Sequence, residues 1–212
     1  MPAPRIKLCG LTDSTALDAA IAARADFAGF NFSPPSPRFL PPAMAAELGA
    51  RAAGRIGRVG VFVDADNAAI ADAVAAARLD AIQLHGSESP QRAAELRTQF
   101  GLPIWRVIGV AKAEDIAQAT AYVGAADFIL FDAKTPKGTL PGGMGLAFDW
   151  SLLAGLRIGL PWGLAGGLNP ANVAEAVRLT AAPLVDAASG IESAPGVKDP
   201  ARIAEFCAAA RS

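Results

Sequence analysis

The sequence predicts an α/β protein with a parallel, eight-stranded core. Short apolar runs alternate with Ala-rich amphipathic stretches, and the alternation occurs eight times in 212 residues. Such regular alternation gives parallel strands joined by helical crossovers. Glycine-containing turns follow the last two apolar runs, which is where (β/α)8 barrels commonly bind phosphate. We therefore expect a single (β/α)8 TIM barrel over residues 1–212, with an open doubly wound sheet as the alternative.

The apolar runs define the strands, and capping residues define several helix starts. The predicted strands are residues 5–9, 26–32, 56–63, 81–85, 104–110, 128–132, 162–165 and 184–188. Between them, apolar residues three or four positions apart, such as Leu17 and Ile21, indicate the buried face of a helix. A capping residue precedes proline at Ser89-Pro90, Asn169-Pro170 and Asp199-Pro200. The longest connection, residues 133–146, is rich in Gly and Pro and predicts a mobile lid over the barrel mouth.

The composition is typical of a globular protein without a strongly charged partner. The chain is 52% hydrophobic and 18% charged, with a mean hydropathy of +0.33 and a net charge of −1. Because the sequence has no basic stripe and no long apolar run, we expect the protein neither to bind nucleic acid nor to associate with a membrane. Cys9 and Cys207 are the only cysteines and form no metal-binding pattern, so we expect no metal and no disulfide scaffold. We expect a cytoplasmic protein, either a monomer or a homodimer.

The turns after the last two predicted strands are candidates for binding phosphate. The first contains Gly166 and Gly167, and the second contains Ser189 and Gly190. Glycine lets backbone N–H groups approach a ligand with no side chain in the way. A helix that begins after Asn169 would add partial positive charge. One such turn alone is most simply a tight strand-to-helix connection, but two in tandem favour a phosphate clamp.

Polar residues end three otherwise apolar strands, where barrel enzymes place reacting groups. Cys9 ends the first strand, His85 the fourth and Asp132 the sixth. Because the first and sixth strands lie apart around the ring, Cys9 and Asp132 could face each other across a substrate as general base and general acid. Lys7 lies on the same side of its strand as Cys9 and would favour the thiolate. Burial in the barrel mouth would raise the pKa of Asp132.

Structural roles for these residues compete with the catalytic ones. Cys9 could be a small buried hydrophobe. Asp132 could cap a helix or pair with Lys134 or Lys137. His85 is the only histidine and a natural candidate for acid–base work, but the residues after it are typical of a turn. Its role is therefore left open.

Two charged residues are candidate substrate ligands. Arg38 ends a proline-rich loop after the second strand, which suits bidentate binding of a carboxylate, although a solvated surface arginine fits equally well. Asp186 lies within the apolar eighth strand, so it must pair with a cation such as Lys7 or hydrogen-bond a ligand. With the phosphate clamp, these residues indicate proton transfer next to a carbonyl or imine carbon in a small sugar phosphate, without a metal or redox centre.

Taken together, the motifs resemble the phosphoribosylanthranilate isomerase family of tryptophan biosynthesis. The matching segments run nearly end to end in the family's order, at residues 7–12 (KLCGLT), 32–38, 83–86 (QLHG), 130–132 (LFD), 142–150, 164–173 and 185–199. The resemblance implies an Amadori rearrangement of an N-linked ribofuranosyl amine to the open-chain aminodeoxyketose, with no cofactor. It implies that Asp132 protonates the ring oxygen and that Cys9 then removes the C2′ proton.

The resemblance also assigns ligand contacts, and the sequence departs from the family at two positions. It implies that Arg38 contacts the anthranilate carboxylate and that Gly143, in the glycine-rich lid, binds phosphate. Met144 stands where the family usually has Thr or Ser, and Ala188 replaces a common Ser. Since backbone N–H groups could still bind phosphate, we expect an altered affinity rather than altered chemistry.

Two other functions compete with this one. The related histidine-pathway isomerase, or an enzyme serving both pathways, performs the same rearrangement on a substrate with two phosphates. Its sites use a carboxylate at the position of Cys9 and need a second phosphate-binding surface, for which the turns after the third and fourth strands give no signal. A barrel that binds a sugar phosphate without turnover would keep the glycines, but it would have no reason to place Cys9 and Asp132 at opposing strand ends.

Overall fold

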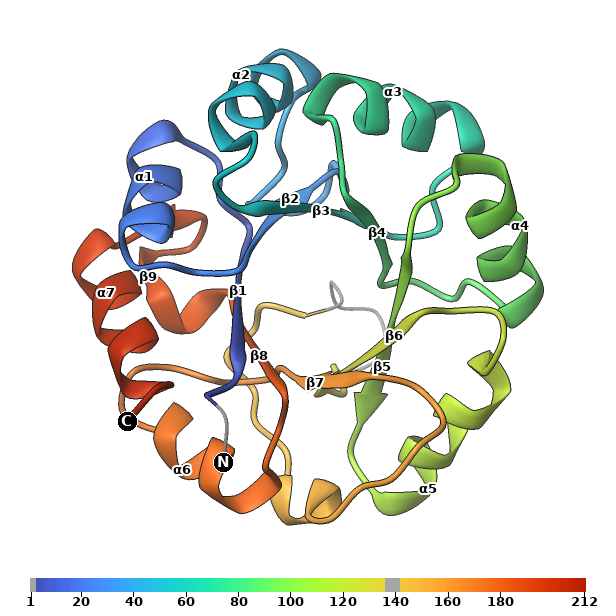
Figure 1. The fold of residues 1–212 in the computed structure, drawn as a ribbon, viewed down its shortest axis with the longest axis vertical. Coiled ribbons are helices and arrows are strands. Elements are labelled where there is room, and N and C mark those ends of the chain that lie inside the picture. Colours follow the sequence, from blue (N-terminus) through green and yellow to red (C-terminus); the bar gives the residue numbers. More distant parts are fainter. Residues whose placement is uncertain (1–2, 136–141) are drawn as a thin grey trace.

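The computed structural model describes residues 3–135 and 142–212 and contains a closed barrel of eight parallel strands (Figure 1). Each strand pairs with the next along the chain, and β8 pairs with β1 to close the ring. The strands are β1 (Arg5–Cys9), β2 (Phe27–Asn31), β3 (Gly57–Phe62), β4 (Ala81–Leu84), β5 (Ile104–Val110), β6 (Phe128–Ala133), β7 (Trp162–Leu164) and β8 (Leu184–Ala187). The predicted barrel is confirmed, and no predicted strand end is off by more than one residue.

The helices surround the ring of strands (Figure 1). The α-helices are α1 (Ser14–Ala22), α2 (Pro42–Ala52), α3 (Asn67–Ala77), α4 (Pro90–Phe100), α5 (Ala113–Ile116), α6 (Val173–Thr180) and α7 (Pro200–Ala209). Short 3-10 helices are η1 (Ala117–Tyr122), η2 (Trp150–Leu153) and η3 (Ser189–Ile191). As predicted, Ser89 and Asp199 cap α4 and α7, and each side chain accepts a hydrogen bond from a backbone N–H of the first turn.

The connections after β6 and β7 differ from the predicted regular alternation of strand and helix. In the described part of the chain, β6 is followed only by the short η2 rather than by an α-helix. The connection from η2 to β7 contains Gly155, Gly159 and Pro161, which do not support a helix. The unit after β7 begins later than expected, because α6 starts at Val173 and not at Pro170. In the turn that precedes the helix, Oδ1 of Asn172 accepts a hydrogen bond from the backbone N–H of Asn169, and Oδ1 of Asn169 accepts one from that of Ala171.

A small antiparallel hairpin that the sequence did not indicate follows the barrel. Its strands are β9 (Glu192–Ala194) and β10 (Val197–Lys198), inserted between η3 and α7. Its turn lies against the loop after β2, since a Cβ at Gly196 would come 2.5 Å from the carbonyl oxygen of Pro37. The hairpin thereby brings residues of the C-terminal region to the loop that carries Arg38.

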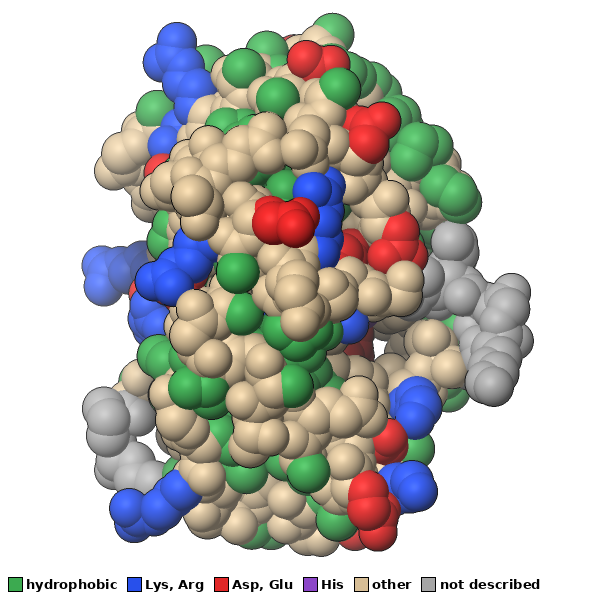
Figure 2. All heavy atoms as spheres, turned by 90° about the vertical axis from the view of Figure 1, so that its right-hand side faces the viewer, with side chains coloured by type: hydrophobic (Ala, Val, Ile, Leu, Met, Phe, Trp, Pro, Cys, Tyr) green, Lys and Arg blue, Asp and Glu red, His purple; other side chains and the backbone are tan. Residues whose placement is uncertain are grey.

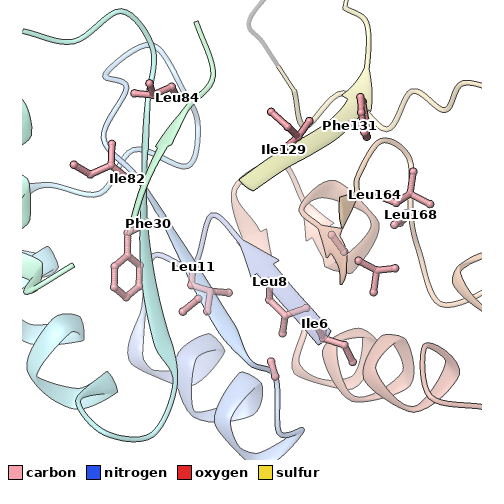
Figure 3. Close-up of a cluster of buried hydrophobic side chains, with 14 of the residues drawn as sticks. Ile6, Leu8, Leu11, Phe30, Ile82, Leu84, Ile129, Phe131, Leu164 and Leu168 are labelled. Atoms are coloured by element: carbon pink, nitrogen blue, oxygen red, sulfur yellow. The ribbon is translucent and has the colours of Figure 1, made fainter. Parts of the chain in front are cut away.

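Alternation along the strands separates two apolar regions. One set of strand residues packs between the ring and the helices, as Figure 3 shows for Ile6, Leu8, Phe30 and Phe131. The other set fills the inside of the barrel, where the ring of Trp105 stacks on that of Phe128 with centroids 4.5 Å apart. Because side chains alternate faces along a strand, Phe128 and Leu130 of β6 lie in this inner cluster on the same face as Asp132, whereas on β1 Lys7 lies on the same face as Cys9.

The outer surface has a mixed character. On the face in Figure 2, basic and acidic side chains are interspersed and hydrophobic side chains are scattered among them. Across residues 3–135 and 142–212, none of the helices is both long and apolar enough to cross a membrane.

The contact between α2 and α3 gives a stability prediction. A Cβ at Gly49, in α2, would lie 2.4 Å from the carbonyl oxygen of Ala77 in α3. We expect Gly49→Ala to lower the free energy of unfolding by about 1–2 kcal/mol, because overpacking outweighs the roughly 1 kcal/mol gain in helix propensity. Urea denaturation would measure the change. The exposed neighbour Ala50 serves as control, since Ala50→Gly should lose only about 1 kcal/mol. A stabilised Gly49→Ala variant would contradict the close contact.

Candidate active site

A cavity of about 520 Å³ occupies the mouth of the barrel at the carboxyl ends of the strands. Its size is that of a pocket for a small organic ligand. Cys9, Arg38, Asp132 and Asp186 all line it, as does His85. The residues predicted to act on and bind the substrate therefore meet in one cavity, which the strand alternation described above produces.

Lys7 and Asp186 form a buried ion pair across the seam between β1 and β8. They are register partners in the sheet, and the Nζ of Lys7 donates to Oδ2 of Asp186 over 2.8 Å. The Lys7 side chain is fully buried. Desolvation opposes its charge, but Asp186 and Cys9 beside it raise its pKa overall. The other carboxylate oxygen, Oδ1, is buried and lacks a hydrogen-bond partner among the described residues, so Asp186 pairs with lysine and keeps one acceptor.

Cys9 lies at the end of β1 and is only partly buried. Desolvation raises the pKa of its thiol, Lys7 acts in the opposite direction, and the net shift is upward. Asp186 adds to the rise and Lys198 opposes it. The expectation that Lys7 favours the thiolate is thus right in sign. Desolvation is the larger effect, however, because removing a charge from water costs more than one neighbouring cation returns.

Asp132 and His85 face each other at the ends of β6 and β4. Oδ2 of Asp132 lies 3.4 Å from Nε2 of His85, and Oδ1 accepts a hydrogen bond from the backbone N–H of Ala133. Both side chains are largely buried, with 12% of Asp132 and 16% of His85 exposed. The turn after β4, which gave His85 an ordinary appearance in the sequence, therefore places its ring beside the predicted general acid.

Arg38 is held by a partner that the sequence did not indicate. Its Nε donates to Oε1 of Glu192 over 2.7 Å, and its Nη2 donates to Oε2 over 2.8 Å. Nη2 also donates to the carbonyl oxygen of Gly143 over 3.0 Å. Lys198, from β10, donates to Oε1 of Glu192 over 2.6 Å. The guanidinium group of Arg38, which was predicted to bind a substrate carboxylate, thus already binds the carboxylate of Glu192 through one of its edges.

The two turns predicted to bind phosphate, which follow β7 and β8, lie next to each other at the mouth of the barrel. Gly166, Gly167 and Ser189 line the cavity, as does Gly143 from the described part of the predicted lid. Gly166 and Gly167 have φ values of 85° and 69°, which glycine adopts readily. Gly190 is not among the lining residues. A Cβ there would lie 2.0 Å from the carbonyl oxygen of Leu168, so Gly190 lets the β8 turn pack closely against the β7 turn, and its role in binding phosphate stays a prediction.

The predicted lid lies only partly within the described residues. Gly142, Gly145 and Leu146 also line the cavity, while residues 136–141 lie outside the described part of the chain. Met144 lines the cavity too, and it is 50% exposed. The turn after β8 keeps the second departure from the family, Ala188, at the cavity wall. Within residues 3–135 and 142–212, no group of three or more His, Cys, Asp or Glu side chains could hold a metal ion.

A closed barrel with an acid–base lined cavity at the carboxyl ends of its strands places the chain among the (β/α)8-barrel enzymes. The model of the N-(5'-phosphoribosyl)anthranilate (PRA) isomerase family matches residues 6–209. The N-(5'-phosphoribosyl)anthranilate isomerase of Paramagnetospirillum magneticum is 52% identical over 207 residues, which cover 97% of this chain and 96% of that one. The chain belongs to the N-(5'-phosphoribosyl)anthranilate isomerase family, as its motifs predicted.

Solved structures agree with this assignment. The phosphoribosyl anthranilate isomerase of Thermotoga maritima is 33% identical, has a TM-score of 0.88 and is matched over 98% of both chains. Another structure of such an isomerase, in complex with reduced 1-(o-carboxyphenylamino)-1-deoxyribulose 5-phosphate, is 31% identical with a TM-score of 0.83, again over 98% of both chains. The relationship therefore covers the whole barrel and is not limited to a few motifs.

Sequence reasoning missed three residues of the cavity region. Glu192 and Lys198 were not singled out, because their hairpin has no strand-like alternation. Gln83, in the QLHG motif, lines the cavity and has a buried Oε1 without a partner among the described residues. An uncharged polar residue inside an apolar strand was the available signal for Gln83. An acidic and a basic residue flanking a Pro-Gly turn were the signal for the hairpin pair.

Thiol titration tests the electrostatics of Cys9. In a Cys207→Ala background, we expect the pH at which Cys9 reacts half-maximally with iodoacetamide to lie above that of an ordinary cysteine, because burial raises its pKa. Lys7→Met should move that midpoint further up, because the neighbouring cation is lost. Asp186→Asn should move it down, because a nearby negative charge is removed. Equal midpoints in all three proteins would contradict this account.

Proposed function

We propose that this cavity binds N-(5'-phosphoribosyl)anthranilate and that Cys9 and Asp132 catalyse its Amadori rearrangement to 1-(2-carboxyphenylamino)-1-deoxyribulose 5-phosphate, a step of tryptophan biosynthesis. Isomerase activity follows from membership of the family. One observation carries the assignment of roles: the thiol of Cys9, the carboxyl group of Asp132 and the glycine-containing turns after β7 and β8 all line one cavity.

In the first step, Asp132 acts as general acid. Its proton passes to the ring oxygen of the ribofuranosyl group, the bond between C1′ and that oxygen breaks, and the nitrogen lone pair forms a protonated Schiff base with C1′. A hydroxyl group remains at C4′. The position of His85, whose Nε2 lies 3.4 Å from Oδ2, supports this role, because the imidazole lies beside the carboxyl group at the mouth of the barrel.

In the second step, Cys9 acts as general base. Its thiolate removes the C2′ proton, and the electron pair moves to form an enolamine as the nitrogen becomes neutral. Protonation at C1′ and loss of the proton of the C2′ hydroxyl group then give the ketone at C2′. The raised pKa of the free thiol is compatible with this step, because the protonated Schiff base brings a positive charge close to the sulfur and favours the thiolate. No external electron acceptor is needed, since the imine holds the electrons.

Substrate binding is assigned to three further places on the cavity wall. Backbone N–H groups of the turns after β7 and β8, with Gly143 from the lid segment, would hold the phosphate. The free Oδ1 of Asp186 would accept a hydrogen bond from a sugar hydroxyl, which would satisfy a buried acceptor. Arg38 would bind the anthranilate carboxylate through the part of its guanidinium that Glu192 leaves open.

The described turns disfavour the histidine-pathway alternative. A second phosphate site after β3 and β4 would need backbone N–H donors there. Instead, the N–H groups of Asp64 and Gly86 donate to Glu88, and that of Ser87 donates to Asp64, over 2.7–2.9 Å. Carboxylates already take these donors and would repel a phosphate. A single phosphate and a carboxylate therefore match this cavity better than two phosphates.

Steady-state kinetics test the proposed roles. We expect the wild type to convert N-(5'-phosphoribosyl)anthranilate but not the two-phosphate substrate of the histidine pathway. Cys9→Ala and Asp132→Asn should each lower kcat by roughly 10²- to 10⁴-fold, the usual contribution of a proton-transfer group, with KM changed much less. Cys207→Ala removes a thiol buried away from the cavity and should keep full activity. Full activity in either active-site variant would refute its assigned role.

A further inference from the structure

The starting observation is the number of N–H donors that Arg38 has left for a ligand. A guanidinium carries five of them. The Nε hydrogen and one Nη2 hydrogen go to the two oxygens of Glu192, and Nη2 also donates to the carbonyl of Gly143. For Nη1, no acceptor is found in the described portions of the chain. Glu192 thus decides which edge of the guanidinium a ligand can reach.

Glu192 is itself fixed and cannot easily yield its place to a ligand. Its side chain is only 4% exposed, and Lys198, which donates to Oε1, is fully buried. Lys198 also donates to the carbonyl oxygen of Ala188 over 2.9 Å, at the turn after β8. The backbone carbonyl of Glu192 accepts a hydrogen bond from Arg202 in α7. Displacing the carboxylate would leave the Lys198 ammonium buried without its counter-charge, which is strongly unfavourable.

We propose that Glu192 is a positioning residue for the reaction: it orients Arg38 so that Nη1 meets the carboxylate on the aromatic ring of the substrate, and it thereby sets the preference for a carboxylated aryl amine. This inference rests on the proposed function, because it presupposes that Arg38 binds that carboxylate. Glu192 does not touch the reacting atoms. Its effect on the preference between substrates passes through Arg38, so this effect can be separated from a general structural role and from its contact with Lys198.

The test compares two substrates that differ only in the carboxylate, the phosphoribosyl adducts of anthranilate and of aniline. Glu192→Gln keeps the size of the side chain but replaces one accepting oxygen with an NH2 group that cannot receive the Arg38 or Lys198 donors. We expect kcat/KM for the anthranilate adduct to fall about 10- to 100-fold, the effect of one lost charge-assisted hydrogen bond. The loss should lie in KM, and the aniline adduct should change less than about twofold.

A double-mutant cycle with Arg38→Gln shows whether Glu192 acts through Arg38. Arg38→Gln alone should abolish the preference for the anthranilate adduct, and adding Glu192→Gln to it should have no further effect. Glu88→Gln is the matched control, because Glu88 is also a buried glutamate, only 5% exposed, that pairs with an arginine. Its partner is Arg106, whose Nη1 lies 2.7 Å from Oε2 of Glu88, and not Arg38. It should leave the ratio of the two substrates unchanged. If Glu192→Gln does not fold, Glu192→Asp, which keeps the charge but shortens the reach, gives the same comparison.

The outcomes separate this inference from the proposed function. If Arg38→Gln keeps the preference for the anthranilate adduct, the carboxylate role of Arg38 is wrong and the inference falls with it. If Arg38→Gln loses the preference but Glu192→Gln retains it, the inference alone is overturned. A lower KM for the anthranilate adduct in Glu192→Gln would also overturn it, because Glu192 would then compete with the substrate instead of orienting its ligand.

Discussion

The closing seam between β1 and β8 carries a buried ion pair on which the site depends. Lys7 and Asp186 are paired by strand register, so the ring can close only with these charges side by side. A buried pair contributes little net stability, but loss of one partner leaves an uncompensated charge. The pair also fixes two neighbours. Cys9 follows Lys7 on the same face of β1, and the turn containing Ser189 follows Asp186 along β8. The seam between β1 and β8 therefore positions both the Cys9 thiol and the turn containing Ser189.

This arrangement disfavours the thiolate form of Cys9. Burial and the Asp186 charge oppose the thiolate, while Lys7 and Lys198 favour it, and the first pair of effects is larger. A raised pKa lowers the fraction of thiolate, which is the form of cysteine that reacts with electrophiles and oxidants. On the proposed function, the missing positive charge is supplied by the Schiff base that Asp132 generates. The order of the two proton transfers then follows from electrostatics as well as from the chemistry of the imine.

The strands and their polar ends could be predicted because those signals are local. An apolar run that ends in Cys, His or Asp is visible within a few residues, and closure of the barrel then gathers such ends in one place. The partner of Arg38 could not be predicted in this way, because Glu192 lies 154 residues further along the chain. The same holds for the pKa of Cys9, which depends on desolvation by the assembled barrel. The packing of Gly190 against the carbonyl oxygen of Leu168 could not be predicted either, because it depends on how closely the folded barrel brings the turns after β7 and β8 together.

The two buried charge clusters at the mouth differ in net charge, and that difference suits a substrate with two anionic ends. Lys7 and Asp186 cancel, whereas Arg38 and Lys198 outnumber the single carboxylate of Glu192 by one positive charge. The chain as a whole has a net charge of −1, so attraction for an anion has to be local. One surplus positive charge beside Arg38 matches one carboxylate. The phosphate can then be left to backbone N–H groups, which bind anions without bringing a further buried charge that would need its own partner.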